Sequence, residues 1–136
     1  MPRVLSLLSV LFLLLSCSAE GEVCSFVRRD DLSAPFYTFT VDMSDASASY
    51  DISILGRASY KPVNNLELKI RWIAPSGESF VDRVYMKTIT AHGDQERYWS
   101  GVIPRQNGIW KVAVLPGDGA DGLLGMGLIC KKNGTR

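Results

Sequence analysis

The sequence predicts an all-β protein, an antiparallel β-sandwich of about seven or eight strands that follows a cleaved lipoprotein signal peptide. Three observations predict the sandwich. Apolar and polar residues alternate with period two along several segments, as in strands with one buried and one wet face. Turn-forming residues separate these segments, roughly every 8 to 12 residues. Apolar residues at helical spacings of three and four do not recur over a useful length.

The first half of the domain contains the clearest strands. Residues 22–27 are a weaker strand that starts the domain. Residues 36–43, 50–54 and 66–72 follow with regular alternation. Each of these segments has one apolar face, which we expect to line the core. In the clearest case, residues 66–72, the apolar face comprises Leu66, Leu68, Ile70 and Trp72.

The second half contains weaker strands with strong turns between them. We expect strands over residues 80–86, 99–103, 109–115 and 124–130. The turns are Pro75-Ser76-Gly77, Asn107-Gly108 and the glycine-rich segment 116–122, whose residues suit tight turns and hairpins. In the last strand Gly125 and Gly127 alternate with the apolar residues, which allows a neighbouring strand or loop to approach closely.

The first 16 residues are interpreted as a signal peptide and excluded from the fold. One positive charge, Arg3, precedes the apolar run of residues 4–15, which has the size of a signal-peptide core and is shorter than the roughly 20 residues of a membrane span. Leu14-Leu15-Ser16-Cys17 resembles the bacterial lipobox. That resemblance implies cleavage before Cys17, a diacylglycerol on its thiol and an acylated amino terminus. Such an anchor would hold the protein stably on a membrane.

The resulting organisation is a signal peptide over residues 1–16, a lipidated tether over 17–21 and a β-sandwich domain over 22–136. Glu20 and Glu22 follow Cys17 closely, a pattern that resembles the surface-export signal of Bacteroidetes lipoproteins and equally suits a solvated tether. We therefore expect an outer-membrane lipoprotein of the cell envelope, on either its periplasmic or its surface face.

Charge and cysteine content narrow the class further. Without Arg3, 14 of the 15 basic residues remain against 14 acidic ones, so the mature chain is near neutral and lacks the basic patch of a nucleic-acid-binding protein. Cys24 and Cys130 lie near the two ends of the mature chain. In an oxidising envelope they could form a disulfide if the first and last strands are neighbours. The alternative is two buried thiols.

Catalytic and metal-binding patterns are not evident. His92 is the single histidine and lies in a loop-like stretch, whereas a metal site or an activated nucleophile needs several convergent groups. Asp118 and Asp121 alternate with glycines but lack the closing glutamate of a calcium loop. We therefore expect no enzymatic activity, no metal and no cofactor.

Aromatic residues are numerous for a small domain. Trp72 and Trp110 fall on apolar strand faces, so core packing accounts for them. Tyr98 and Trp99 stand beside Glu96 and Arg97 and are the candidate ligand-binding pair at the surface. A row of exposed aromatic residues beside a groove would indicate a module that binds glycans or peptides.

The mature chain resembles the GldH family of gliding-motility lipoproteins of Bacteroidetes. The resemblance rests on the stretches TFTVDMSDASASYDISILGR, NNLELKIRWIAPSGESFVDRV, NGIWKVAVLPG and GLLGMGLICKK. It implies a small lipid-anchored protein that is associated with the gliding machinery and its linked secretion system, and it assigns no catalytic residue.

Two functions follow as hypotheses. The first is an accessory binding module of this envelope complex, with the membrane and envelope proteins as partners and no small-molecule ligand expected. The second is a surface lipoprotein that captures glycans or peptides for nutrition.

Overall fold

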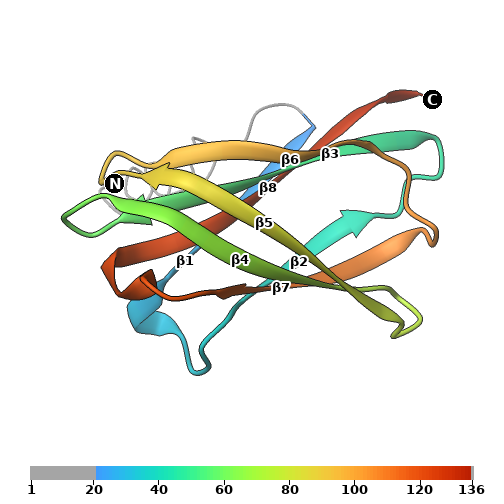
Figure 1. Ribbon diagram of the computed structural model, residues 1–136. Helices are drawn as coiled ribbons and strands as arrows, with labels where there is room; N and C mark the ends of the chain where they lie inside the picture. Colours follow the sequence, from blue (N-terminus) through green and yellow to red (C-terminus); the bar gives the residue numbers. More distant parts are fainter. Residues whose placement is uncertain (1–20, 136) are drawn as a thin grey trace, which may run out of the picture.

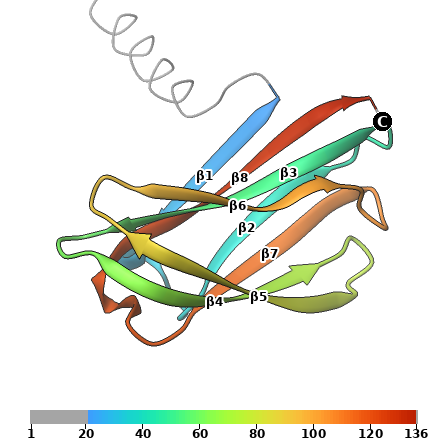
Figure 2. The same cartoon turned by 45° about the horizontal axis from the view of Figure 1, so that its top comes forward.

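Residues 21–135 are described by a computed structural model (Figure 1). They form two four-stranded sheets, with strand orders β1-β8-β3-β6 and β2-β7-β4-β5, and every pairing is antiparallel. The two sheets form separate layers that face each other (Figure 2), so the predicted sandwich is confirmed. The strands are β1 Glu22–Arg28, β2 Tyr37–Met43, β3 Ala48–Ala58, β4 Val63–Ile73, β5 Ser79–Ile89, β6 Asp94–Val102, β7 Gly108–Pro116 and β8 Leu123–Thr135.

Short turns of 3-10 helix, η1 (Arg29–Asp31) and η2 (Ala120–Gly122), connect strands at one end of the sandwich. The described part of the chain contains no helix with the length and hydrophobicity that a transmembrane span requires. Cys17 and the predicted signal peptide lie outside the described residues.

The core lies between the two sheets, as the alternation predicts. Along β2 buried and exposed side chains alternate without a break, and Leu66, Leu68 and Ile70 of β4 are completely buried. These inner faces form one continuous cluster of aliphatic and aromatic side chains. Burial of this apolar surface is the main stabilising contribution to the fold.

Several strands extend beyond the predicted segments, and β8 continues to Thr135, five residues past the predicted end at 130. Strand β3 covers eleven residues, more than the predicted 50–54. Strand β6 begins at Asp94, five residues before the predicted 99–103. The early part of β6 is an edge with exposed polar residues, including Gln95 and Glu96, and such a segment carries no apolar alternation that sequence reasoning could detect.

The glycines of β8 make room for an aromatic side chain on the outer face of the sheet. Strand β1 pairs with β8, and Phe26 lies opposite Gly127. A Cβ atom added to Gly125 would stand 2.6 Å from Phe26 Cζ, and one added to Gly127 would stand 3.3 Å from Phe26 Cδ2. The close approach expected at these two glycines is therefore present.

A polar contact fastens the β2–β3 loop to the end of β8. Lys132 Nζ lies 2.6 Å from Asp45 Oδ2, and Asp45 Oδ1 accepts hydrogen bonds from the backbone N–H and the hydroxyl of Ser47. The hydrogen bonds from Lys132 and Ser47 hold the pKa of the Asp45 carboxyl well below its ordinary value. Folding thus favours the charged form of Asp45.

We expect Gly125→Ala to lower the free energy of unfolding by about 1–3 kcal/mol, because the new methyl group collides with Phe26 and the β1 backbone. Gly134→Ala in the same strand is the control, since a Cβ atom there meets nothing within 4 Å, and it should change stability by less than about 0.5 kcal/mol. Urea denaturation measures both. Equal effects would contradict the close packing at Gly125.

We also expect the stability contribution of Asp45 to depend on pH. Because its pKa is lowered by folding, the contribution is fully present above the ordinary carboxyl pKa of 3.8 and is lost as the pH falls below that value. Asp45→Asn should therefore be less stable than the wild type at pH 7, and the difference should vanish in strong acid. Urea denaturation at a series of pH values tests this. Asp118→Asn, at an exposed loop position, is the control and should show no such convergence.

Candidate functional site

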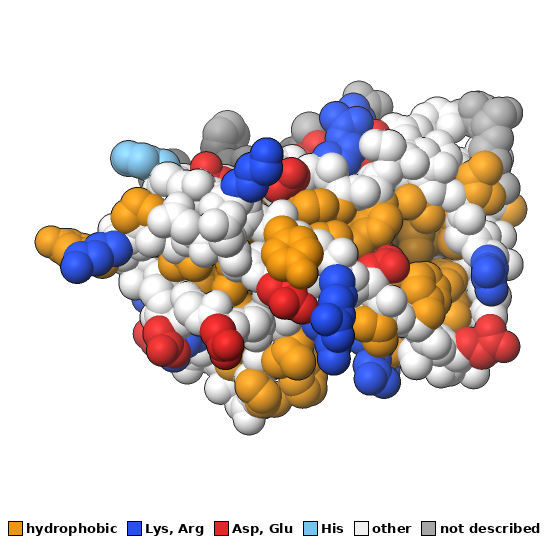
Figure 3. Space-filling model, in the orientation of Figure 1, with side chains coloured by type: hydrophobic (Ala, Val, Ile, Leu, Met, Phe, Trp, Pro, Cys, Tyr) orange, Lys and Arg blue, Asp and Glu red, His pale blue; other side chains and the backbone are white. Residues whose placement is uncertain are grey.

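A cavity of about 460 Å³ opens between the two sheets on the side where the edge strands β5 and β6 face each other. Space filling shows an apolar hollow on this face of the molecule (Figure 3). Strands β4, β5, β6 and β7 and the β6–β7 loop all contribute to its lining. We call it the tryptophan pocket, and its lining residues are Met43, Trp72, Phe80, Asp82, Trp99, Val102, Ile103, Pro104, Arg105 and Trp110.

Aromatic rings from both sheets form the walls of this pocket. The Trp72 ring, from β4, meets Trp99 of β6 edge to face, with centroids 4.9 Å apart. Phe80 of β5 stacks on Trp72 at 6.3 Å and meets Trp110 of β7 edge to face at 6.2 Å. These three contacts connect the four rings into one wall. Contacts of this kind stabilise the fold by about 0.5–1.5 kcal/mol each beyond area burial.

Two of the three tryptophans that line the pocket donate their indole N–H to a described residue, and the third does not. Trp72 Nε1 donates to Asp82 Oδ2 at 3.1 Å, and Trp110 Nε1 donates to the Gln106 carbonyl at 2.9 Å. Trp99 Nε1 makes no hydrogen bond to any described residue, although its half-buried ring lines the pocket. A bound molecule could accept a hydrogen bond from this group.

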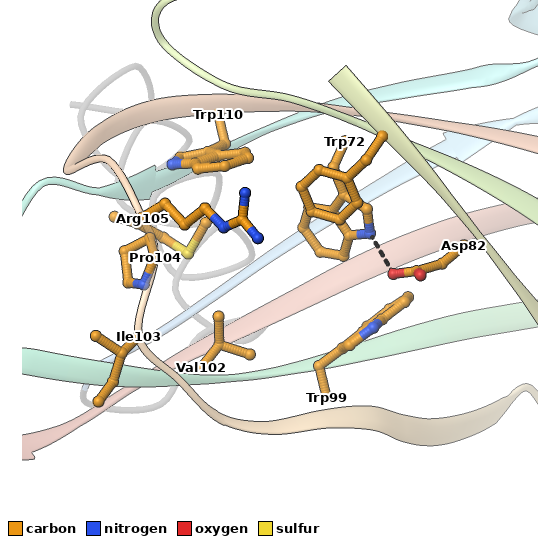
Figure 4. Close-up of a pocket in the computed structure, with 10 residues that line it drawn as sticks. Trp72, Asp82, Trp99, Val102, Ile103, Pro104, Arg105 and Trp110 are labelled. Atoms are coloured by element: carbon orange, nitrogen blue, oxygen red, sulfur yellow. Dashed lines mark hydrogen bonds between the residues drawn. The ribbon is translucent and has the colours of Figure 1, made fainter. Parts of the chain in front are cut away.

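Two charged side chains flank the apolar lining (Figure 4). The Asp82 carboxylate lies beside Trp72, and the guanidinium of Arg105 points from the β6–β7 loop into the space between Trp110 and Trp72. Arg105 is exposed, and no carboxylate of residues 21–135 lies within ion-pair distance of it. Its donors are therefore available to an anionic group.

Strand β6 presents Tyr98 and Trp99 together because its pairing with β3 is irregular. The register shifts between the pair Ile52–Trp99 and the pair Ser53–Arg97, which leaves Tyr98 as an extra residue, as in a β-bulge. Strict alternation would place Tyr98 and Trp99 on opposite faces. Instead both rings pack against the core cluster, with centroids 5.7 Å apart.

A second shift in the same strand is held by Asp51 of β3. The register changes again between Tyr50 and Ile52, near Gly101, whose φ of +61° suits glycine. The Gly101 N–H donates to Asp51 Oδ1 at 2.8 Å, and this bond is the main reason that the pKa of Asp51 lies below its ordinary value. Asp51 therefore fixes the end of β6 that borders the pocket.

The candidate pair from the sequence thus separates into two roles. Trp99 lines the pocket. Tyr98 donates its hydroxyl hydrogen bond to the Tyr85 carbonyl at 2.7 Å, and the same oxygen lies 2.9 Å from Glu96 Oε2. Burial, and then the Glu96 carboxylate, raise the pKa of Tyr98. Tyr98 therefore links the edges of β5 and β6 beside the pocket.

The cysteines of the described chain do not form the disulfide that the sequence allowed. Strands β1 and β8 are neighbours, but Cys130 lies opposite Val23 and Cys24 lies opposite Ile129. Cys24 and Cys130 therefore point to opposite faces of the sheet, and the structure does not link them. Burial, followed by the charges of Asp42 and Asp51, raises the pKa of Cys130 to about 11, so its thiol is a poor nucleophile at neutral pH. Cys17 lies outside the described residues.

The remaining residues considered from the sequence do not line the tryptophan pocket. His92 is exposed in the β5–β6 turn. Asp121 pairs with Arg29 at 3.2 Å, and Asp118 is exposed in the β7–β8 loop. Residues 21–135 contain no group of three or more histidine, cysteine or acidic side chains that could hold a metal ion.

Sequence reasoning missed part of the pocket. It placed Trp72 and Trp110 in the core, and each is indeed only 4% exposed, yet both rings also line the pocket. Phe80, Asp82 and Arg105 carry no such signal in the sequence, because Phe80 and Asp82 lie within a weak strand rich in aromatic and β-branched residues and Arg105 lies in a loop. The one usable signal was Trp99.

Comparison with known proteins adds little to this geometry. No protein-family model and no curated protein sequence matches the chain. Among solved structures, the chain is similar to TmCBM61 in complex with β-1,4-galactotriose, with 10% identity, a TM-score of 0.37 and coverage of 89% of this chain and 93% of the other. So remote a likeness carries no argument about function.

We expect the tryptophans of the pocket to differ in their contribution to stability. Trp110→Ala should lower the free energy of unfolding by about 3–5 kcal/mol, because a buried ring is removed. Trp99→Ala should lower it by about 1–2 kcal/mol, since that ring is half-exposed and loses mainly its edge-to-face contacts. Urea denaturation followed by circular dichroism measures both. A Trp99→Ala loss as large as that of Trp110→Ala would assign Trp99 to the core.

Proposed function

We propose that this protein is a non-enzymatic, membrane-anchored lipoprotein that acts as an accessory binding module of a gliding- or secretion-associated envelope complex, with the tryptophan pocket as its binding site. The observation that carries the binding role is the pocket itself. It combines a connected aromatic wall with an open indole N–H and an uncompensated guanidinium. Ligand sites commonly have this character, with apolar lining and a few convergent polar groups.

We propose a binding role without catalysis because of the residues that line the tryptophan pocket. Asp82, the carboxylate of the pocket, already accepts the Trp72 hydrogen bond. No hydroxyl, thiol or imidazole stands among the lining residues to act as a nucleophile or a base. This set of groups suits binding and orientation of a ligand.

The anchored state rests on the sequence that precedes the domain. Leu14-Leu15-Ser16-Cys17 ends the apolar run, and lipid on Cys17 would tether the sandwich to the outer membrane. Several acyl chains on one residue give stable anchoring, whereas a single chain gives only marginal binding.

The assignment to a gliding or secretion complex rests on the family resemblance. The matching stretches fall on β2–β3, β4–β5, β7 and β8, which together supply most of the core. An accessory protein of such a complex needs a surface for protein partners, and the exposed edge of β5 beside the pocket offers one.

Capture of glycans is the second candidate function. Its support is the aromatic wall, because tryptophan rings stack on sugar faces. The lining opposes it, because a sugar brings many hydroxyl groups that need hydrogen-bond partners when they lose water. The pocket offers few polar groups for them.

Co-purification from native membranes in mild detergent tests the proposal. We expect the wild-type protein to be recovered from the membrane fraction with lipid on Cys17, as read by mass spectrometry, together with components of the gliding or secretion machinery. Cys17→Ser should move the protein to the soluble fraction and lose those components.

A matched substitution controls for nonspecific effects. Cys24→Ser leaves the proposed anchor intact and should retain the membrane location and the partners. An unmodified Cys17 in the wild type would overturn the anchored state. Recovery exclusively with carbohydrate-uptake proteins would favour the second candidate function.

A further inference from the structure

We propose that the ligand of the tryptophan pocket is an extended acidic peptide segment of a partner protein, which pairs as an added strand with β5 and inserts one large apolar side chain into the pocket. This inference rests on the proposed binding function and names its ligand. Three features of the β5 side carry it: an open strand edge, an apolar receptacle beside that edge, and positive charge around both.

Strand β5 is an edge strand whose outward backbone groups face the gap toward β6. It pairs with β4 alone within its sheet. The Tyr85 carbonyl points toward β6, because it accepts the Tyr98 hydroxyl. Backbone groups alternate in direction along a strand, so Val81 and Arg83 also turn their N–H and C=O groups toward the gap. No described residue hydrogen-bonds to them there.

Tyr98 sets the limit of this open edge. Its hydroxyl occupies the outward edge of β5 at Tyr85. The part of β5 whose outward edge is open therefore runs from Ser79 to Arg83. That part lies beside the pocket, which Phe80 and Asp82 line from the inner face of β5. A strand added here would therefore pass directly over the pocket mouth, with alternate side chains pointing inward.

Exposed apolar side chains mark the same stretch. Phe80 is 51% exposed and Val81 is 44% exposed, on opposite faces of an edge strand. Natural edge strands usually carry protection against pairing, such as proline, bulges or inward charges. Between Ser79 and Arg83 the inward charge is Asp82, and it is bonded to Trp72, so the edge remains able to pair.

A peptide fits the pocket better than a sugar does. The peptide satisfies its own backbone on the β5 edge and needs to bury only one side chain, which an apolar lining favours. The open Trp99 N–H can donate a hydrogen bond to a peptide carbonyl.

The positively charged side chains beside the pocket and the β5 edge favour a peptide with acidic residues. Arg105 turns an uncompensated guanidinium into the pocket, and carboxylates bind such a group with paired hydrogen bonds. On the outer face beside β5, Arg83 is partly neutralised by Glu67 at 3.4 Å, but other exposed cations remain. They are Lys69, Arg71, Lys87 and Lys111.

Titration with designed peptides tests the inference on the full chain in mild detergent. The probes are seven-residue peptides with an acetylated amino terminus and an amidated carboxyl terminus. The central residue is leucine, tryptophan or serine, and on each side of it threonine alternates with a charged residue, which is either glutamate or lysine. We expect the glutamate-flanked leucine and tryptophan peptides to bind at least about tenfold more tightly than the lysine or serine versions. Calorimetry measures the affinities.

Two changes separate the backbone and charge contributions. Arg105→Ala should abolish the preference for glutamate over lysine flanks, whereas Arg28→Ala, an exposed arginine at the far end of β1, should retain it. Methylation of alternate peptide nitrogens, tested in both registers, should abolish binding in one register and spare it in the other. This test needs no protein variant that might misfold.

Other outcomes overturn the inference. Saturation by a β-1,4-linked hexasaccharide or by anionic phospholipid vesicles without peptide binding would assign the pocket to another ligand and leave the binding module in place. Concentration-dependent self-association lost in Arg105→Ala would assign the edge to a second copy of the chain. Peptide affinity that is indifferent to methylation and to Arg105 would exclude strand pairing. If the wild-type protein co-purified from native membranes without any gliding or secretion component, the proposed function itself would be wrong.

Discussion

Burial of one face of each sheet against the other is the constraint on which this structure depends. Completely buried aliphatic side chains from β3 and β4 fill the middle of the sandwich. Toward the border between β5 and β6 large rings take over, and Trp72 from one sheet meets Trp99 from the other. Rings are rigid and cannot adapt to an irregular space as flexible side chains do. The same packing that joins the sheets therefore leaves the pocket between them.

The sequence predicts the layers well because alternation is a local property. A strand with one buried face needs apolar residues at every second position, and β2 and β4 follow this rule closely. The early part of β6 escapes prediction because an exposed edge has no buried face to impose a pattern. Register also escapes prediction: one residue of offset between β1 and β8 separates Cys24 from Cys130, and no feature of either segment alone determines that offset.

The pocket was only partly predictable for a related reason. Trp99 stands out as an aromatic residue in polar surroundings, whereas Trp72 is indistinguishable in sequence from a purely structural residue. Its second role arises from the tertiary arrangement, which brings Phe80 and Asp82 of β5 and Arg105 of the β6–β7 loop around it. The bulge at Tyr98, which turns two consecutive aromatic residues to one side, leaves no mark in the pattern either.

The first strand begins at the end of the sandwich that carries the pocket, and this position limits how far the pocket can lie from the proposed membrane anchor. Glu22 lies opposite Lys131, and Tyr50 lies opposite both Lys132 and Val102, so β1 starts at the same end of the sandwich as the β6–β7 loop of the pocket. With the anchor proposed at Cys17, five residues of chain reach at most about 18 Å. The pocket would then search a thin layer of space above the bilayer, where a partner held on the same membrane is far more concentrated than one diffusing in solution.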